Sequence, residues 1–406
     1  MTARPDAPHV LIYEPRTEGH HLVWLRYFME DLLGAGVRLT LALDRRPAAW
    51  ERIQAHLQTM LAEVMTLPIF ESDGAPIARG HLASLAACQR RAKADSVFLP
   101  SLDEIASACF RRAALGWLPE AALKGRLGGV YFRPRMLLPA RSPNQLLKRA
   151  GFRRMLRQRW FRQILFCDEY LCAAAQVRHP DAPLFFLPDP FPDHFAGPRT
   201  DARRALRLPD DKTIFLFYGG PYRRKGLPLA VEAMLGLPLD CCALLLCVGE
   251  QPQDEVLSRK LASLSERGLA HCLGWRVDNE EEKTAFAACD FVLLPYLQHF
   301  GSSAVLARAA GAGRIAIVSD EGLIGRRVRD HGLGMLFASG DADALRECLR
   351  RAFQLSASER AAFAPALARY ASTCTRERFR EALLRSFSGQ LTGPDETFCR
   401  PREGAR

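Results

Sequence analysis

Two loops in the second half of the sequence carry residues that suit the binding of phosphate. The first follows the apolar run 214–218 and supplies two glycines and three cations, namely Gly219, Gly220, Arg223, Arg224 and Lys225. Glycine lets a backbone approach a ligand closely, and cations at the entrance of a helix attract an anion. The pattern predicts a diphosphate site, and its alternative is a solvated basic turn.

The second loop reads Phe300-Gly301-Ser302-Ser303 and opens a helix that we expect over Ala304–Ala310. Backbone N–H groups at a helix start, together with two hydroxyl groups, can hold an anion. A plain serine N-cap is the competing interpretation.

Candidates for a general base lie in the first half. The loop Glu14–His21 contains Gly19, His20 and His21, and a histidine there can act as a base near neutral pH or serve as a capping or packing residue. Asp103, after the apolar run Ser96–Leu99, is a further base candidate. Ser101 and Glu104 also form a capping box, which we favour for that loop.

These loops need strands and helices to bring them together. Short β-rich runs alternate with helical patterns, and the runs are His9–Tyr13, Val37–Leu43, Ser96–Leu99, Ile214–Tyr218, Ala243–Val248, Phe291–Leu294 and Ile315–Val318. Continuous apolar strands separated by helices indicate parallel sheets covered on both faces. We predict an α/β fold with two Rossmann-like, doubly wound domains that face a cleft, with the chemistry at the carboxyl ends of the strands.

The domain limits follow from a proline-dense stretch. Leu187–Pro192 holds three prolines and cannot continue a helix or a central strand, so it reads as a linker. We predict domains over residues 1–192 and 193–388, followed by a disordered tail over 389–406.

The positive charge is concentrated in one block. Between Ala121 and Cys167 there is no Asp or Glu, and the lysines and arginines of residues 124–162 contribute +12, so the rest of the +11 chain nets −1. Apolar residues recur there at helical spacing, namely Phe152, Met155, Leu156, Trp160 and Ile164. The block predicts a basic amphipathic helix, which is either an ordinary domain helix or a surface for anionic lipid. Nucleic acid is a third interpretation, which we disfavour because no nucleic-acid module is evident.

Several classes of protein are excluded by the sequence. No apolar stretch is long enough for a membrane span, and the twelve cysteines have neither C-x-x-C pairs nor zinc spacing, which indicates reduced, cytoplasmic thiols. The sequence also lacks G-x-G-x-x-G, the P-loop and G-x-S-x-G, so dinucleotide oxidoreductases, P-loop NTPases and α/β-hydrolases are disfavoured.

A succession of motifs in the second half resembles a known family. The motifs are the Gly219–Gly226 loop, Val248–Glu250, Leu273–Arg276, Ala288–Pro295, Phe300–Ser303, Ala310–Gly313 and Ile317–Asp320. In order and spacing they are similar to the carboxyl-terminal domain of GT-B glycosyltransferases of the group 1 (family 4-like) type, over about residues 213–350. The first half resembles the family more loosely, through its Gly-His-His loop.

The resemblance implies an acceptor-binding first domain, a nucleotide-sugar-binding second domain, no metal or other cofactor, and usually retention at the anomeric carbon. It implies that Arg224 and Lys225 neutralise the donor diphosphate, whose charge grows as the glycosidic bond breaks. By the same resemblance, other residues surround the donor: Gly301, Ser302 and Ser303 at the phosphates, Gly274, Trp275 and Arg276 at the base, and Gly19 at the diphosphate.

The sequence departs from the family at two glutamates. The family commonly has Glu-x7-Glu, with the first glutamate on the sugar and the second on the ribose, and these positions are Phe300 and Arg308 here. A later family glutamate falls on or beside Gly325–Arg327. Arg308 therefore binds phosphate or faces elsewhere.

We therefore expect a metal-independent, hexosyltransferase-like enzyme of glycan biosynthesis that transfers a sugar from a nucleoside-diphosphate sugar to a glycan or lipid-linked acceptor. Its expected location is the cytoplasm, peripheral at the inner face of the membrane through residues 124–162. The loss of both family glutamates leaves an alternative, a catalytically silent GT-B-like binding or scaffold protein.

Overall fold

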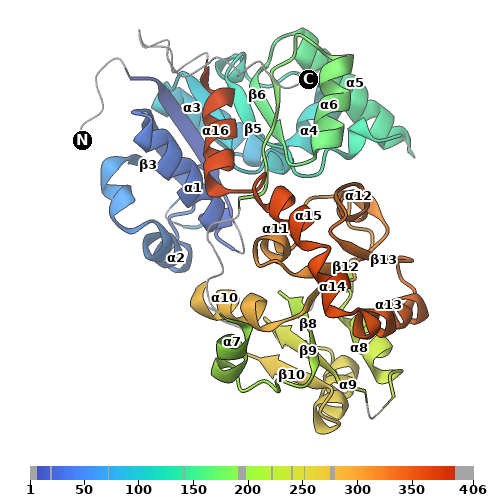
Figure 1. Ribbon diagram of the computed structural model, residues 1–406. Coiled ribbons are helices and arrows are strands. Elements are labelled where there is room, and N and C mark those ends of the chain that lie inside the picture. The colour runs from blue at the N-terminus through green and yellow to red at the C-terminus, as the bar shows by residue number, and fades with distance from the viewer. Residues whose placement is uncertain are drawn as a thin grey trace. The chain divides into compact units, whose positions relative to one another are not determined.

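The computed structural model describes residues 7–18, 21–71, 73–139, 142–190, 198–220, 223–238, 241–250, 252–274 and 279–388. Within these residues the chain forms two compact units (Figure 1). The first unit comprises residues up to Leu187 and from Arg380 onward, and the second comprises Pro188–Phe379.

In the described part of the chain, the first unit is built on a seven-stranded parallel sheet. Its strands are β1 (His9–Glu14), β2 (Arg38–Leu43), β3 (Met65–Pro68), β4 (Ser96–Leu99), β5 (Leu127–Val130), β6 (Phe161–Phe166) and β7 (Leu184–Phe186). The spatial order is β3-β2-β1-β4-β5-β6-β7, so the winding direction reverses between β1 and β4. Open parallel sheets bind ligands outside the carboxyl ends of their strands at such a reversal.

Helices connect these strands. They are α1 (His21–Gly34), α2 (Pro47–Leu57), α3 (His81–Ala92), α4 (Asp103–Ala114), α5 (Pro143–Arg157) and α6 (Glu169–Arg178), with short 3-10 turns η1 (Gln58–Glu63), η2 (Ala121–Leu123) and η3 (Arg135–Leu137). Every residue of β1 and β4 is buried, as expected for central strands of a sheet that is covered on both faces.

The second unit repeats this plan with a six-stranded parallel sheet among the described residues. Its strands are β8 (Thr213–Tyr218), β9 (Ala243–Val248), β10 (Ala270–Leu273), β11 (Phe291–Leu294), β12 (Ile315–Ser319) and β13 (Gly334–Phe337). The order β10-β9-β8-β11-β12-β13 reverses between β8 and β11. The loops after β8 and β11 therefore meet at the ligand-binding point of this sheet.

The helices of the second unit are α7 (Arg199–Ala205), α8 (Leu227–Leu235), α9 (Glu255–Glu266), α10 (Asn279–Ala288), α11 (Ala304–Gly311), α12 (Gly322–His331), α13 (Ala342–Gln354), α14 (Ala357–Ala361) and α15 (Ala364–Ala371), with the 3-10 turn η4 (Arg223–Lys225). At the centre of the core, the fully buried rings of Phe215 in β8 and Phe291 in β11 stack with centroids 5.3 Å apart.

The predicted α/β fold with two Rossmann-like sheets is confirmed, and each of the seven predicted strands is present. The sequence reasoning missed six further strands, β3, β5, β6, β7, β10 and β13. Five of them have only three or four residues, and β5 and β13 contain glycine, which weakens the strand signal.

The end of the chain belongs to a different unit from the one that the sequence suggests. Residues 380–388 fall within the predicted second domain, 193–388, but α16 (Arg376–Ser386) crosses between the units and its later part joins the first. Phe387 is buried and its ring lies 5.5 Å from that of Phe98 in β4. This contact joins residues that are far apart in the chain, so no local pattern in the sequence reveals it. The predicted tail, 389–406, lies outside the described residues.

The basic block does not form one long helix. α5 ends at Arg157, Arg159 has a positive φ of 54°, and Ile164 lies in β6. The prediction that Trp160 and Ile164 continue the helix is therefore wrong. The apolar residues continue at helical spacing beyond the end of α5, because the buried strand β6 begins at Phe161 and contains apolar residues of its own.

The apolar face of α5 is part of the core. Phe152 and Met155 are fully buried, and α5 approaches α4 so closely that a Cβ on Gly151 would lie 1.7 Å from the carbonyl oxygen of Phe110. Arg153 and Arg157 remain exposed. α5 is thus a domain helix with a basic outer face.

Candidate functional site

The loops after β8 and β11 pack directly on each other at the reversal point of the second sheet. The N–H of Leu297 donates to the carbonyl oxygen of Arg224 at 2.8 Å. Gly226, with φ of 75°, allows the approach, because a Cβ there would lie 1.8 Å from the carbonyl oxygen of Pro295. The sequence-predicted residues Arg223–Lys225 and Phe300–Ser303 are thereby placed on two neighbouring loops.

Lys225 reaches back over the start of its own loop. A Cβ built on Gly219 would lie 2.1 Å from the Nζ of Lys225, and Gly219 has a φ of 110°, which favours glycine. Burial, with the positive charges of Arg224 and Arg308 nearby, lowers the pKa of Lys225 to about 8. A desolvated ammonium group against bare backbone is a strong partner for an incoming phosphate, because the anion relieves the repulsion among the cations.

Arg224 is positioned by a histidine that sequence reasoning did not assign. The Nδ1 of His299 lies 2.8 Å from Arg224 Nη1, and its Nε2 lies 3.1 Å from the carbonyl oxygen of Ser302. A carbonyl only accepts, so Nε2 donates and Nδ1 accepts from the guanidinium. Burial lowers the pKa of His299 to about 4, so the ring is neutral at physiological pH and ties the two loops together.

The hydroxyl of Ser302 points to a buried ion pair. It donates to Asp189 Oδ1 at 3.0 Å, and Arg327 of α12 donates to Asp189 Oδ2 at 3.1 Å. The side chains of Arg327 and Asp189 are 3% and 4% exposed. The Ser302 hydroxyl hydrogen is therefore engaged within the protein.

Ser303 occupies the N-cap position of α11, but its side chain makes no capping hydrogen bond. The plain N-cap interpretation is thus wrong for this serine. The Ser303 hydroxyl instead hydrogen-bonds the Tyr296 hydroxyl, whose pKa is raised by burial. The first N–H groups of α11 have no intrahelical partner and carry the positive end of the helix dipole.

Arg308 pairs with a carboxylate that sequence reasoning also missed. Its Nε donates to Glu282 Oε1 of α10, and the hydroxyl of Tyr218, the last residue of β8, donates to Glu282 Oε2 at 2.7 Å. Burial and the adjacent carboxylate raise the pKa of Tyr218, so its hydroxyl stays protonated. No local pattern in the sequence reveals this pair, because Glu282 and Arg308 lie 26 positions apart in the chain.

The other predicted donor residues lie in these two loops, after β10, or outside the described residues. Gly220 and Gly301 lie in the two loops, Phe300 is half-buried beside Gly301, and Arg223 is exposed. Gly274 directly follows β10 and is exposed. Gly19, His20, Trp275 and Arg276 lie outside the described residues.

In the first unit, the loop after β1 also lies at a reversal point. The side chain of Glu14, at the end of β1, is completely buried, and its Oε2 accepts from His21 Nδ1 at 3.1 Å. The other carboxylate oxygen accepts from the N–H of Arg16 at 2.9 Å. With Nδ1 donating, the imidazole lone pair is on Nε2, the arrangement of a histidine base held by a carboxylate.

Asp103 has a different environment from the one expected. α4 begins at Asp103 with Leu102 as N-cap and no side-chain capping bond, so the predicted Ser101 capping box is wrong. Asp103 instead accepts from the N–H groups of Phe132 and Arg133 at 2.8 and 3.1 Å, which fastens the β5 loop to α4. Burial raises the pKa of Asp103 in spite of these bonds.

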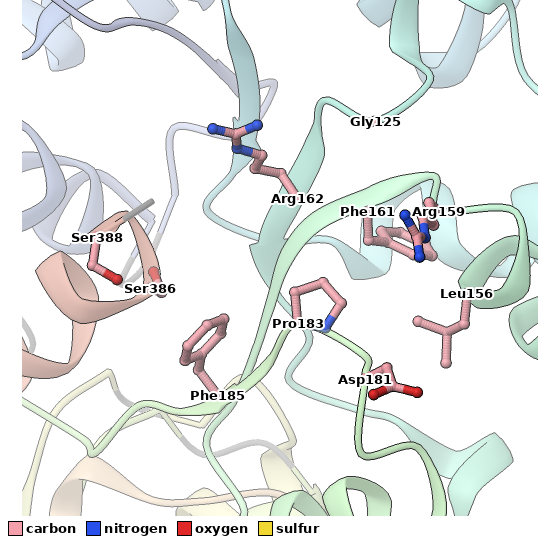
Figure 2. A pocket seen from close by; sticks show the side chains of 10 residues that line it. All are labelled: Gly125, Leu156, Arg159, Phe161, Arg162, Asp181, Pro183, Phe185, Ser386 and Ser388. Carbon is pink, nitrogen blue, oxygen red and sulfur yellow. The ribbon is translucent and has the colours of Figure 1, made fainter. Parts of the chain in front are cut away.

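No group of three or more His, Cys, Asp or Glu side chains within the described residues could hold a metal ion. A cavity of about 580 Å³ in the first unit is lined by residues that include Arg159, Arg162 and Phe185 (Figure 2). Arg162 is near the amino end of β6. The cavity is therefore at the edge of the sheet opposite to Glu14 and Asp103 and is separate from the residues above.

Comparison with known proteins identifies the second unit. Residues 198–367 match the model of the family described as "Glycosyl transferases group 1". The second unit therefore contains a group 1 glycosyltransferase domain. No curated protein sequence matches the chain.

Solved structures show that both units of the chain share the fold of GT-B glycosyltransferases. A glycosyltransferase from Rickettsia africae has a TM-score of 0.69 at 12% identity, with 96% of this chain and 100% of that one covered. Anabaena HepE, solved in complex with UDP, has a TM-score of 0.67 at 14% identity, with 94% of this chain and 100% of that one covered. WaaG, a glycosyltransferase involved in lipopolysaccharide biosynthesis, has a TM-score of 0.61 at 17% identity, with 95% of this chain and 100% of that one covered.

Proposed function

We propose that the enzyme transfers a hexose from a nucleoside-diphosphate sugar to a glycan or lipid-linked acceptor without a metal ion. The observation that carries this proposal is the half-buried Lys225 side chain, whose amine lies against Gly219, beside Arg224 and the start of α11. These groups lie on the loops after β8 and β11, where an open parallel sheet binds its ligand.

The chemistry to be catalysed is the departure of a nucleoside diphosphate from the anomeric carbon. Negative charge grows on the diphosphate as the glycosidic bond breaks, and preorganised cations and helix N–H groups stabilise that charge. Lys225, Arg224 and the first turn of α11 supply them, which supports metal independence as part of the proposal. Addition of EDTA is expected to leave the transfer rate unchanged.

The acceptor hydroxyl needs a base as it attacks. We assign this role to the histidines of the β1 loop, His20 and His21, with Asp103 as the further candidate. The buried Glu14 carboxylate at His21 Nδ1 supports His21, because a carboxylate that accepts from Nδ1 fixes the tautomer with the lone pair on Nε2. His21→Ala is expected to lower kcat with little change in the affinity for the donor.

The proposed classes of donor and acceptor are suggested by the solved structures that this chain resembles. HepE has been solved with UDP-glucose, and WaaG takes part in lipopolysaccharide biosynthesis. Uridine diphosphate hexoses are therefore the first donors to test, and glycan or lipid-linked precursors are the first acceptors.

The proposal places the enzyme in the cytoplasm, peripheral at the inner face of the membrane. No helix in the described residues is long and apolar enough to cross a bilayer. The first unit exposes Arg153 and Arg157 on α5, and Trp117 and Leu146 are 63% and 56% exposed. Basic residues contribute about 1 kcal/mol each at an anionic surface, and tryptophan suits the interface.

Liposome flotation tests this location. Binding to vesicles with anionic lipid, weakened by salt and by Arg153→Glu with Arg157→Glu, is expected. Arg259→Glu on the exposed face of α9 in the second unit is the matched control. Absence of flotation at both low and high salt would contradict the membrane part of the proposal alone.

The rival function is a silent binding protein that keeps the fold. A panel of nucleotide sugars, assayed for donor hydrolysis and for ligand-induced thermal stabilisation, separates the two. Stabilisation with turnover supports the enzyme. Stabilisation without turnover for any donor or acceptor supports the silent protein, and neither effect with any nucleotide sugar rejects both.

A further inference from the structure

Two cysteines of the second unit lie side by side on neighbouring strands and have no part in the roles assigned above. Cys247 of β9 and Cys272 of β10 are paired directly in the parallel register of these strands. Residues in register on parallel strands point to the same face of the sheet, so the two thiols project together. Both pack on the hydrophobic core of the second unit, Cys247 within it and Cys272 at its margin.

The two thiols differ in their exposure to solvent. Cys247 is 6% exposed, whereas Cys272 is half-buried on β10, the edge strand of the sheet in the described part of the unit. A small oxidant from solvent therefore meets Cys272 first. Hydrogen bonding between the thiols lowers the pKa of Cys272 and raises that of Cys247, and the thiolate is the reactive form of cysteine. Cys272 thus has the character of a reacting thiol, with Cys247 beside it to form a bond with the oxidised sulfur.

A disulfide between these two positions is possible but strained. The Cα atoms of in-register residues on neighbouring strands are about 4.8 Å apart, within the range of about 4.4–6.8 Å that a disulfide spans. The Cβ atoms of a disulfide are about 3.8 Å apart, which is less than the spacing of the strands, so the bond must draw β9 and β10 together. Strained disulfides are readily reduced, which is typical of regulatory bonds.

The end of β9 packs against the start of the loop after β8, so a displacement at Cys247 reaches that loop. The N–H of Gly219 donates to the carbonyl oxygen of Val248, the residue after Cys247, at 2.8 Å. A Cβ on Gly249 would lie 2.6 Å from the carbonyl oxygen of Gly219. Cys247 and Gly219 also line one cavity of only about 10 Å³, so little free space is available to absorb a movement. A shift of β9 therefore moves Gly219, against which the Lys225 amine lies.

We propose that Cys247 and Cys272 are a thiol pair that hydrogen peroxide oxidises to a disulfide, and that this disulfide weakens diphosphate binding at the loop after β8. The disulfide is independent of the proposed function, whereas its effect on binding rests on that function. In a reducing compartment such a bond is transient, as redox-sensing disulfides are, and its reduction restores binding.

The oxidation takes two steps. The Cys272 thiolate attacks hydrogen peroxide, so that a sulfur–oxygen bond forms, the oxygen–oxygen bond breaks, and the departing hydroxide takes up the proton that the thiol released. The Cys247 sulfur then attacks the sulfur of the Cys272 sulfenic acid, a sulfur–sulfur bond forms, and hydroxide leaves with the Cys247 proton as water. Two thiols and one peroxide molecule thereby give one disulfide and two water molecules, and two electrons pass from sulfur to oxygen.

Treatment of the full chain with hydrogen peroxide, followed by peptide mass spectrometry without reduction, tests the linkage. A peptide pair joined through Cys247 and Cys272 is expected, and it should disappear after treatment with dithiothreitol. Calorimetry tests the effect on binding, with whichever of uridine, guanosine and adenosine diphosphate binds the reduced protein most tightly. Its Kd is expected to rise by at least about fivefold on oxidation and to return to the original value on reduction.

Cys272→Ser is the test variant, and Cys242→Ser is the matched control, because Cys242 is an exposed thiol directly before β9. After peroxide treatment Cys272→Ser is expected to keep the Kd of its untreated form, and Cys242→Ser to respond like wild type. Thermal unfolding under reducing conditions shows whether each variant is folded, and the comparison of oxidised with reduced wild type needs no variant.

Absence of the linked peptide pair in peroxide-treated wild type overturns the proposal, and oxidation of Cys272 without the linkage does the same. A linkage that leaves the Kd unchanged overturns the effect on the loop while the proposed function stands. Failure of reduced wild type to bind any of the three diphosphates overturns the proposed function, and with it the effect on binding. The mass spectrum then decides the disulfide by itself.

Discussion

The hydroxyl of Ser302 donates a hydrogen bond of 3.0 Å to the carboxylate of Asp189, which lies 113 residues earlier in the chain. Asp189 is the second residue of the second unit, and Ser302 lies at the start of α11. The segment that enters the unit is thereby fastened to a loop of the donor site. A serine that looks like a phosphate ligand in the sequence has its hydroxyl hydrogen directed inward.

Ser302→Ala is therefore expected to affect stability more than donor binding. Loss of one hydrogen bond to a charged group lowers the free energy of unfolding by about 1.5–3 kcal/mol, because the Asp189 carboxylate loses a partner in a buried site. The Kd for uridine diphosphate is expected to stay within about threefold, since the hydroxyl hydrogen of Ser302 is already bound to Asp189. Urea denaturation and calorimetry on the same preparation measure both quantities.

Asp189→Asn provides the comparison. It keeps the shape but leaves Arg327 with a neutral partner, so a larger loss of stability is expected than in Ser302→Ala. A tenfold weaker Kd for uridine diphosphate in Ser302→Ala, without loss of stability, would show that the hydroxyl binds phosphate directly.

Gly219→Ala is expected to weaken donor binding through Lys225. The new methyl group would lie 2.1 Å from Nζ, so the amine must move away, and the backbone φ of 110° is unfavourable for alanine. We expect the Kd for uridine diphosphate to rise by at least about tenfold, as in Lys225→Ala. In the double variant the two effects should not add, because both remove the same contact. Additive effects in calorimetry would place the two residues in separate roles.

The local patterns of the sequence locate the phosphate loops, and the long-range partners of those loops come from the structure. Gly219, Lys225 and the start of α11 are recognisable because glycines, cations and strand ends follow one another along a short stretch. Glu282 and Asp189 cannot be recognised in this way. Their partners, Arg308 and Ser302, lie 26 and 113 positions away in the chain. A charged side chain could pair with many others in the chain, and the packing of helices α10 and α12 determines which ion pairs form.

His299→Asn is expected to change the pH dependence of stability. The pKa of His299 is lowered to about 4 from its usual 6.5, so between these values the unfolded chain binds a proton that the folded chain does not. The stabilising effect of the neutral ring is complete above pH 6.5 and is lost as the pH falls toward 4. Wild type should thus lose about 3 kcal/mol more than the variant over this range, measured by urea denaturation at each pH. Parallel pH profiles for the two proteins would contradict a buried, neutral His299.

Donor binding by wild type is expected to weaken as the pH rises above 8. The pKa of Lys225 in the free enzyme is lowered to about 8, and the protonated amine is the form that binds phosphate. The affinity for uridine diphosphate is therefore constant well below pH 8 and falls above it, by up to about tenfold per pH unit. The phosphate groups do not contribute to this change, because they are already ionised above about pH 7. Lys225→Met, which is similar in length and uncharged, should bind weakly with a flat profile from pH of about 7 to about 9.5. A wild-type affinity that stays constant over the same range would mean that the Lys225 amine titrates at its ordinary pKa, or that the donor does not contact it.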